Sequence, residues 1–347
     1  MIRLKINQKS LFISLLFFFN YALGDLKNVY VYINIKPEYY YEEHHEFLRC
    51  LFGDEYQVML TPTLDKLSNV DYIVTVEVPH NNVELRNLGQ YPPEKVIFFS
   101  FETQISNPRS HNKYYHHYYS KAFTWNDDLI DNIKYFKVRF PWMDPRPMVK
   151  DRPTFENKKL SIFVGEPRQR VGYYANYVAR TELVQFFEVQ PGSDFDLYGL
   201  GWEQSNYKNF KGLIPLIGNR RENKINVLKN YKFDFCYENT INVNGWLSER
   251  IFEDFAAGCV PVYWGCNNVE DYIPRGCFIP RQDFKNNEEL YSFLQNVKKD
   301  EYETYIKNIE QFLTTENAYR LSTRYYIEKI RTVLGINVNN DAISLAQ

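Results

Sequence analysis

The sequence has little cysteine and no excess of either charge. Its five cysteines are an odd number without a C-x-x-C pair, which excludes zinc knuckles and thioredoxin-type redox motifs. Four of them lie between residues 236 and 277 among apolar segments, so we expect buried free thiols, with a disulfide between Cys259 and Cys266 as the alternative. The 41 basic and 43 acidic side chains lack the basic excess typical of nucleic-acid binding, so we expect no nucleic-acid partner.

Glycine and proline are also scarce, with 15 and 16 of 347 residues, which excludes collagen-like and low-complexity chains. The length instead predicts about two globular domains. What the sequence has in excess is aromatic side chains, at 17%. Aromatic rings stack on the flat faces of sugars and bases, so the composition favours a protein that binds carbohydrate or nucleotide.

Long apolar runs are absent after residue 25, and the one before it covers residues 11–23. Three basic residues precede this run, and Ala22-Leu23-Gly24 fits a cleavage site, so residues 1–24 are predicted to be a signal peptide or a signal anchor. The run is shorter than the roughly 20 apolar residues of a standard membrane span. We therefore expect a soluble body after residue 25, attached to a membrane if the segment is not cleaved.

That body is predicted to form two α/β halves separated by a proline-rich segment at residues 141–147. Alternating apolar residues predict a strand at residues 28–35, and helical spacing follows it. Further predicted strands lie at residues 56–60, 71–77, 95–101, 122–125, 160–164, 195–198, 231–237 and 260–264. We place an N-terminal domain at residues 25–150, a C-terminal domain at 155–335 and a tail at 336–347.

Strands that alternate with helices predict mostly parallel sheets covered on both faces. Ligands of such sheets bind at the carboxyl ends of the strands, where helix N-termini present free N–H groups. We therefore expect two facing α/β domains with a cleft between them.

The densest pattern is at residues 231–279, where a strand, a polar turn, a helix and another strand follow one another. Ser248 is the expected N-cap of a helix that Gly258 ends. Glu249 and Arg250 then lie in its first turn, where a cation complements bound phosphate and a carboxylate accepts sugar hydroxyls. From spacing alone, an exposed charge pair on a helix is an equal alternative.

Three motifs of this segment are Tyr237-Glu238-Asn239-Thr240, Ser248-Glu249-Arg250 and Gly258-Cys259-Val260-Pro261-Val262-Tyr263-Trp264-Gly265. Their order and spacing resemble the signature of glycosyltransferase family 10, the α1,3/α1,4-fucosyltransferases. A weaker resemblance extends over most of the chain after residue 25. Arg250 replaces the lysine that opens the helix in the family, and the two residues are not equivalent on phosphate.

The resemblance implies a GT-B fold, which consists of two facing Rossmann-like domains. It also implies inverting transfer of L-fucose from GDP-fucose to a hydroxyl of a glycan acceptor. The protein is then expected to hold no obligatory metal and no other cofactor. It further implies donor-binding roles for residues of the C-terminal domain. These are Arg170, Asn239, Trp246, Glu249 and Arg250, with Arg168 as the second choice for Arg170.

Inverting transfer needs a base for the proton of the acceptor hydroxyl. The family's base follows a strand of the N-terminal half, and Glu102 has that place after residues 96–101. Glu77, after the strand at residues 71–76, is the next candidate. The resemblance together with the N-terminal segment predicts a Golgi membrane enzyme with a lumenal catalytic domain, with secretion or bacterial membrane association as alternatives.

Other patterns suggest weaker hypotheses. Asp194-Phe195-Asp196 resembles a D-x-D metal motif but runs into a predicted strand, so we interpret it as the strand entry. The histidines lack the fixed spacing of a metal site, and the aromatic segment 113–121 is a candidate acceptor groove. Two alternative functions remain open at this point: a GT-B enzyme that uses another nucleotide sugar, and a catalytically silent glycan-binding protein.

Overall fold

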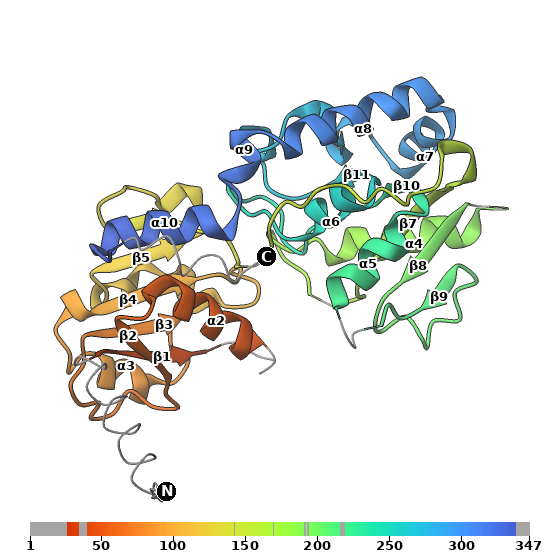
Figure 1. The fold of residues 1–347 in the computed structure, drawn as a ribbon. Helices are drawn as coiled ribbons and strands as arrows, with labels where there is room; N and C mark the ends of the chain where they lie inside the picture. The colour runs from red at the N-terminus through yellow and green to blue at the C-terminus, as the bar shows by residue number, and fades with distance from the viewer. Residues whose placement is uncertain are drawn as a thin grey trace, which may run out of the picture.

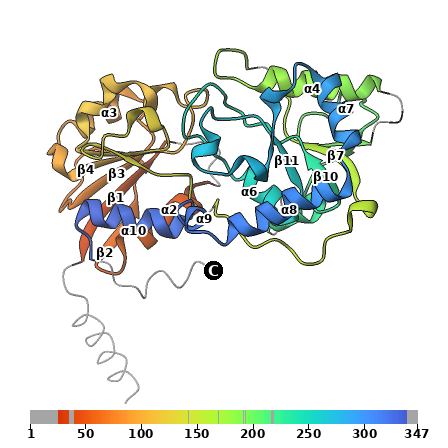
Figure 2. The ribbon, with the colours of Figure 1, turned by 90° about the horizontal axis from the view of Figure 1, so that it is seen from above.

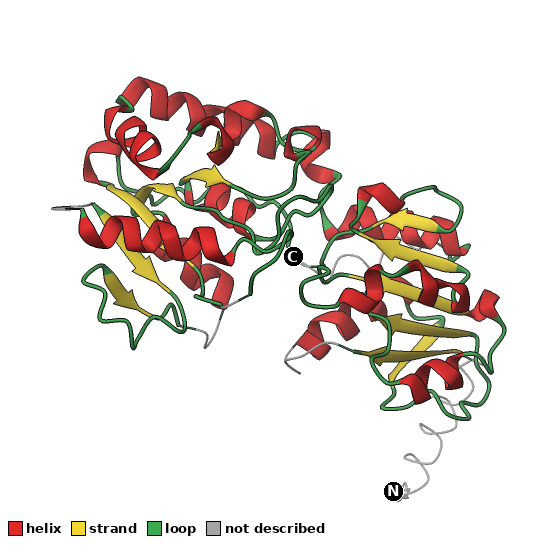
Figure 3. Cartoon of the chain, turned by 180° about the vertical axis from the view of Figure 1, so that it is seen from behind, coloured by secondary structure: helices red, strands yellow, loops and turns green. Residues whose placement is uncertain are grey.

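The computed structural model describes residues 26–34, 40–141, 143–168, 170–190, 192, 194–215 and 219–337. They form two α/β bodies side by side, each with a sheet between layers of helices (Figures 1 and 3). The expected signal segment at residues 1–24 and most of the expected tail lie outside the described residues. Within the described part of the chain, no helix is both long and apolar enough to cross a membrane.

The N-terminal sheet has six parallel strands in the order β2-β1-β3-β4-β5-β6. The strands are β1 Lys27–Ile33, β2 Tyr56–Leu60, β3 Tyr72–Val76, β4 Val96–Ser100, β5 Lys121–Thr124 and β6 Tyr135–Lys137. Successive side chains of a strand point to opposite faces. Ile97 accordingly packs with helix α2 (Tyr40–Phe52) on one face, and Phe98 with helix α3 (Asn82–Leu88) on the other. Because both faces are covered, β4 is buried along its whole length.

The C-terminal sheet is also parallel, in the order β12-β11-β10-β7-β8-β9. Its strands are β7 Lys159–Val164, β8 Phe195–Tyr198, β9 Phe210–Gly212, β10 Tyr231–Asp234, β11 Val260–Tyr263 and β12 Ile279–Pro280. Five helices cover it: α4 Tyr177–Val189, α5 Arg220–Leu228, α6 Arg250–Ala257, α7 Asn287–Asn296 and α8 Lys299–Leu313. Phe163 packs with α4 on one face, and Ile162 packs with α5 and α6 on the other.

The end of the chain departs from the expected domain range of 155–335. After α9 (Glu316–Tyr319), helix α10 (Thr323–Leu334) returns to the N-terminal domain and packs there, as Figures 1 and 2 show. Its residues Tyr326, Ile327 and Ile330 belong to the core of the N-terminal sheet. Arg331 donates hydrogen bonds to the Leu51 and Cys50 carbonyls at the end of α2. The sequence pattern of α10 indicates an amphipathic helix but does not say which sheet receives its apolar face.

Hydrogen bonds also join the two domains directly. Buried Arg139, which follows β6, donates to the carbonyls of Leu321 at 2.7 Å and Leu247 at 3.1 Å. Thr240 and Thr103 form a buried hydroxyl–hydroxyl hydrogen bond of 2.9 Å across the same boundary. These contacts hold the strand ends of the two sheets near each other.

Candidate active site

A pocket of about 510 Å³ lies between the two domains. Its walls come from the segments that follow β4, β7 and β10, so it lies at the carboxyl ends of strands from both sheets. Most of the residues predicted from the sequence line it. They are Glu102 from the N-terminal domain, and Arg168, Asn239, Trp246, Glu249 and Arg250 from the C-terminal domain.

Glu102 reaches this pocket from the turn that follows β4. Its backbone amide donates to Glu77 Oε1 at 2.8 Å, and its carbonyl accepts from Trp125 Nε1 at 3.0 Å. Burial raises the pKa of the Glu102 carboxyl, and the charge of Glu249 adds to that increase. A carboxylate with a raised pKa holds a proton more readily, which suits a general base.

Arg250 begins helix α6 and faces the same pocket. Its Nη1 donates to the carbonyl of Val164, the last residue of β7, at 2.7 Å. Burial opposes its charge, but the carboxylates of Glu249 and Glu238 outweigh burial and raise the pKa of the guanidinium. Burial would also raise the pKa of Glu249, yet Arg250 and Lys224 hold it below its usual value. Both groups of the predicted pair are therefore charged.

The local sequence explains how α6 presents this pair. The N-cap of helix α6 is Glu249, one residue later than the expected Ser248, whose Oγ nevertheless accepts from the Arg250 amide at 3.3 Å. Gly258 ends the helix in the left-handed region at φ +62°, as predicted. The left-handed backbone favours glycine, and an added Cβ would also lie 2.7 Å from Arg152 Cδ, so that side chain would have to shift.

Two predicted residues place unpaired polar atoms at the pocket. Asn239 Oδ1 and Trp246 Nε1 are buried without a hydrogen-bond partner among the described residues. Such atoms are costly unless something pairs with them. One accepts and the other donates a hydrogen bond, so the pair suits a ligand with both hydroxyl and carbonyl or ring-nitrogen groups.

The structure places Arg168 rather than Arg170 on the pocket wall. The exposed Arg168 pairs with Glu166 at 2.7 Å in the loop after β7. Arg170 is exposed and donates to the carbonyl of Ile105 at 3.0 Å, in the N-terminal domain. Both positive charges nevertheless act on the Glu102 carboxyl and oppose the rise in its pKa.

Other arginines that line the pocket were not predicted from the sequence. Among them are Arg220 and Arg221 in the first turn of α5. Asn219 caps this helix by accepting from the Glu222 amide at 3.2 Å. A cation in the first turn opposes the helix dipole unless an anion is present, so two adjacent arginines after a capping asparagine were a detectable signal of an anion site. Arg180 of α4 and Arg146 also line the pocket.

The candidate metal motif has a structural role. Asp196 of β8 accepts from Lys159 at 2.6 Å and from the Tyr231 hydroxyl at 2.7 Å, and it does not line the pocket. A separate buried group consists of Asp234, Cys236 and Asp254, whose ligand-type atoms lie within 4.8 Å of one another. Burial raises the pKa of Asp234 to about 6 and that of Asp254 well above its usual value, which indicates a carboxyl pair that shares one proton. All five cysteines are free, so Cys259 and Cys266 form no disulfide.

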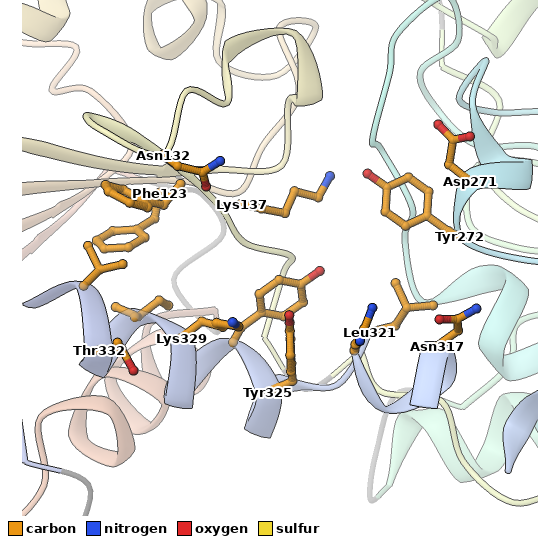
Figure 4. A pocket seen from close by; sticks show the side chains of 15 residues that line it. Phe123, Asn132, Lys137, Asp271, Tyr272, Asn317, Leu321, Tyr325, Lys329 and Thr332 are labelled. Atoms are coloured by element: carbon orange, nitrogen blue, oxygen red, sulfur yellow. The ribbon is translucent and has the colours of Figure 1, made fainter. Parts of the chain in front are cut away.

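A second pocket, of about 540 Å³, lies between β5, β6 and α10 (Figure 4). Lys137 and Tyr272 point toward each other across it, from different domains. Asp127 joins them, because it accepts from Lys137 Nζ at 2.7 Å and from the Tyr272 hydroxyl. Lys137 and Tyr272 thus bind a protein carboxylate, and none of the predicted site residues lines this pocket.

Comparison with known families gives a match in the half that carries most of the predicted site. Residues 171–330 match the family described as "Glycosyltransferase family 10 (fucosyltransferase) C-term". A mouse relative, 4-galactosyl-N-acetylglucosaminide 3-alpha-L-fucosyltransferase 9, is 28% identical over 243 residues. The matched part covers 67% of this chain and 58% of the mouse protein.

Comparison with solved structures agrees on the fold. An α1,3-fucosyltransferase with GDP-fucose superposes with a TM-score of 0.56 at 16% identity, over 91% of this chain and 93% of that one. The Anabaena protein HepE in complex with UDP gives a TM-score of 0.55 at 10% identity, over 89% of this chain and all of the other. The predicted architecture of two facing Rossmann-like domains is thereby confirmed.

Proposed function

Because the chain belongs to glycosyltransferase family 10 through residues 171–330, we propose that it transfers L-fucose from GDP-fucose to a hydroxyl group of a glycan. One observation carries the proposal. A single pocket combines a carboxylate of raised pKa, Glu102, from one domain with an arginine-rich wall from the other. These are the two groups that glycosyl transfer from a nucleoside diphosphate requires: a base for the acceptor and cations for the leaving group.

The proposed reaction is a single displacement with inversion. The acceptor oxygen forms a bond to the anomeric carbon of fucose while Glu102 takes the hydroxyl proton. The bond between that carbon and the diphosphate oxygen breaks, and the electron pair leaves with GDP. Arg250 and Arg168 then stabilise the developing charge, together with Arg220 at the N-terminus of α5. Since guanidinium groups supply this charge, we propose that no metal held by the protein is needed.

The donor nucleotide has a proposed place along the same wall. Asn239 Oδ1 accepts a hydrogen bond from the ligand, and Trp246 Nε1 donates one, because both atoms lack protein partners among the described residues. Glu249 accepts hydrogen bonds from hydroxyl groups of the ribose or the sugar. For the acceptor we propose a galactosyl-N-acetylglucosamine type of glycan, from the name of the mouse relative.

A panel of nucleotide sugars tests the proposal. Purified protein is incubated with GDP-fucose, GDP-mannose, UDP-galactose or UDP-glucose and an N-acetyllactosamine acceptor, and nucleotide release and product mass are measured. We expect turnover with GDP-fucose only, and little in the Glu102→Gln variant. Turnover with another donor while GDP-fucose stays inert would reject the donor assignment.

Another nucleotide sugar is the second candidate donor. Arg250 stands where the family has lysine, and the same fold is found in a protein bound to UDP. A silent glycan-binding protein is a third possibility, and calorimetry that detects glycan binding without any affinity for GDP would support it. The presence of Glu102 and the arginines in one pocket argues against this third reading.

For the compartment we propose a Golgi membrane protein with its catalytic body in the lumen, anchored through residues 1–24. The basic and then apolar N-terminal sequence supports this proposal, as does the need for GDP-fucose on the same side as the acceptor. Secretion after cleavage, or attachment to a bacterial membrane, are the alternatives. Fractionation of cells that express the tagged full chain tests it, and cytosolic protein with residues 1–24 intact would overturn it.

A further inference from the structure

Glu77 is a buried carboxylic acid whose place differs from that expected of a base. It follows β3, and its side chain is fully inaccessible to solvent. It does not line the 510 Å³ pocket between the two domains, called the cleft pocket from here on. A base must come within hydrogen-bond reach of the acceptor hydroxyl. The alternative prediction that Glu77 takes the proton therefore has no support in the geometry.

What Glu77 contacts instead is the backbone that carries Glu102. Its Oε1 accepts two hydrogen bonds from consecutive amides, Phe101 N at 2.6 Å and Glu102 N at 2.8 Å. The carbonyl of Glu102 is held on its other side by Trp125 Nε1 at 3.0 Å and by His111 Nε2 at 2.9 Å. The peptide groups on both sides of the Glu102 Cα are thus fixed by Glu77 after β3, by Trp125 after β5, and by His111 of the segment that follows β4 itself.

The backbone of Glu77 is itself in an uncommon conformation. Its φ of +66° lies in the left-handed region, which a non-glycine residue adopts only when the surroundings impose it. Glycine would be the easier residue at such a φ, so the presence of glutamate indicates that its side chain is needed. Burial raises its pKa to about 8, and the carbonyl oxygen of a neutral carboxyl accepts hydrogen bonds as well.

We propose that Glu77 is a positioning residue that orients Glu102 for proton transfer by holding its backbone amide and the preceding one. The proposal rests on the proposed function, in which Glu102 is the base. It assigns Glu77 no contact with donor or acceptor. Its loss therefore changes the rate of the chemical step and leaves binding of the nucleotide in place.

The test uses three substitutions at one position. Glu77→Gln keeps an oxygen that accepts both amides, so its kcat should stay within about threefold of the wild type. Glu77→Ala and Glu77→Gly remove the acceptor, and kcat should fall about 10- to 100-fold, the scale of a misplacement of about 1 Å. The Kd for GDP, measured by calorimetry, should stay within twofold in all three.

Glycine separates positioning from folding. It suits the left-handed φ better than alanine does, so Glu77→Gly should have a Tm at or above that of Glu77→Ala. If activity followed stability, the glycine variant would be the more active one. We expect it to be as slow as the alanine variant or slower.

Glu84 provides a matched control in the same domain. It is also buried, and its Oε2 accepts from the Leu64 amide at 2.6 Å, away from the cleft pocket. Glu84→Ala likewise leaves a loop amide without its acceptor, and we expect the wild-type kcat. A loss like that of Glu77→Ala would show that any lost carboxylate anchor slows the enzyme, which overturns the proposal.

Glu102→Gln, measured alongside, separates this proposal from the proposed function. If it keeps turnover, Glu102 is not the base and the proposed mechanism fails. If it loses turnover while Glu77→Ala and Glu77→Gly keep the wild-type kcat, only the positioning role fails. Combining Glu77→Ala with Glu102→Gln should be no slower than Glu102→Gln alone, because both changes remove the same contribution.

Discussion

Replacing Arg250 tests how strongly the stability of the protein and the proposed binding of GDP depend on one buried charge. Its guanidinium compensates Glu249 and Glu238 and donates to the Val164 carbonyl at 2.7 Å. Removing one partner of a buried ion pair costs about 3–5 kcal/mol. The pocket is open to solvent, so we take the lower end, about 3 kcal/mol, for Arg250→Ala. At roughly 2–4 °C per kcal/mol in a domain of this size, Tm should fall by about 6–12 °C.

Two comparisons isolate the charge. Arg250→Lys keeps the positive charge and loses about one neutral-strength hydrogen bond, so Tm should fall by only about 2–4 °C. The guanidinium fork proposed to bind two phosphate oxygens is lost, so GDP binding should weaken roughly tenfold. Arg320→Ala is the surface control. It removes an exposed pair with Glu316, worth less than about 1 kcal/mol.

The sign of the pH dependence follows from the carboxylates. In Arg250→Ala, burial is no longer opposed by the arginine, so the pKa of Glu249 rises above its unfolded value. A group with a raised folded pKa loses stability as pH rises through that window. The Tm difference from the wild type should therefore be larger at pH 8 than at pH 5. A difference below 2 °C at pH 7.5, measured by scanning fluorimetry, would refute the reasoning, as would an equal difference at both pH values.

Three further outcomes are expected. Glu102→Gln should lower kcat by about 10²–10⁴ with GDP affinity nearly unchanged. In the wild type, the acidic limb of the profile of kcat against pH should lie above the ordinary glutamate pKa, because burial raises the pKa of Glu102. By calorimetry, Arg168→Ala should weaken GDP binding by about 1.5–3 kcal/mol and Arg170→Ala by less, since only Arg168 lines the pocket; the reverse order would contradict this placement. Asp254→Asn should change Tm little below about pH 4 and raise it increasingly toward pH 8, because the raised pKa values of Asp254 and Asp234 mean that the wild type loses stability as pH rises from the unfolded pKa through the folded ones; a lower Tm at pH 8 would contradict the shared proton.

The sequence predicted best those features that depend on neighbouring residues, such as single strands and the ends of a helix. An apolar run predicted the strand before Glu102, and a helix that ends at Gly258 put Arg250 at a strand end. The structure brings both residues to one pocket. A spacing of 148 residues carries no information about contact, so this meeting followed only from the expectation that the carboxyl ends of two facing parallel sheets line one cleft.

The remaining features depend on contacts that no local pattern encodes. Arg168 and Arg170 differ by two positions in one loop, and only the path of the backbone decides which lines the pocket. Arg220 is the exception, because a capping asparagine followed by two arginines is a local signal that the prediction did not use. The boundary at residue 335 failed at α10, since the apolar face of an amphipathic helix fits either sheet equally well by periodicity.

The return of α10 has a consequence for how this protein divides. The chain passes between the domains twice, once between β6 and β7 and once between α8 and α10, so the C-terminal domain is one continuous stretch of sequence and the N-terminal domain is not. A fragment cut after residue 150 would lack Ile327 and Ile330, and its sheet would expose the apolar face that they cover. A chimera that exchanges the C-terminal domain with that of a relative must therefore rejoin the original chain before Thr323, because a single crossover would import a piece of foreign core.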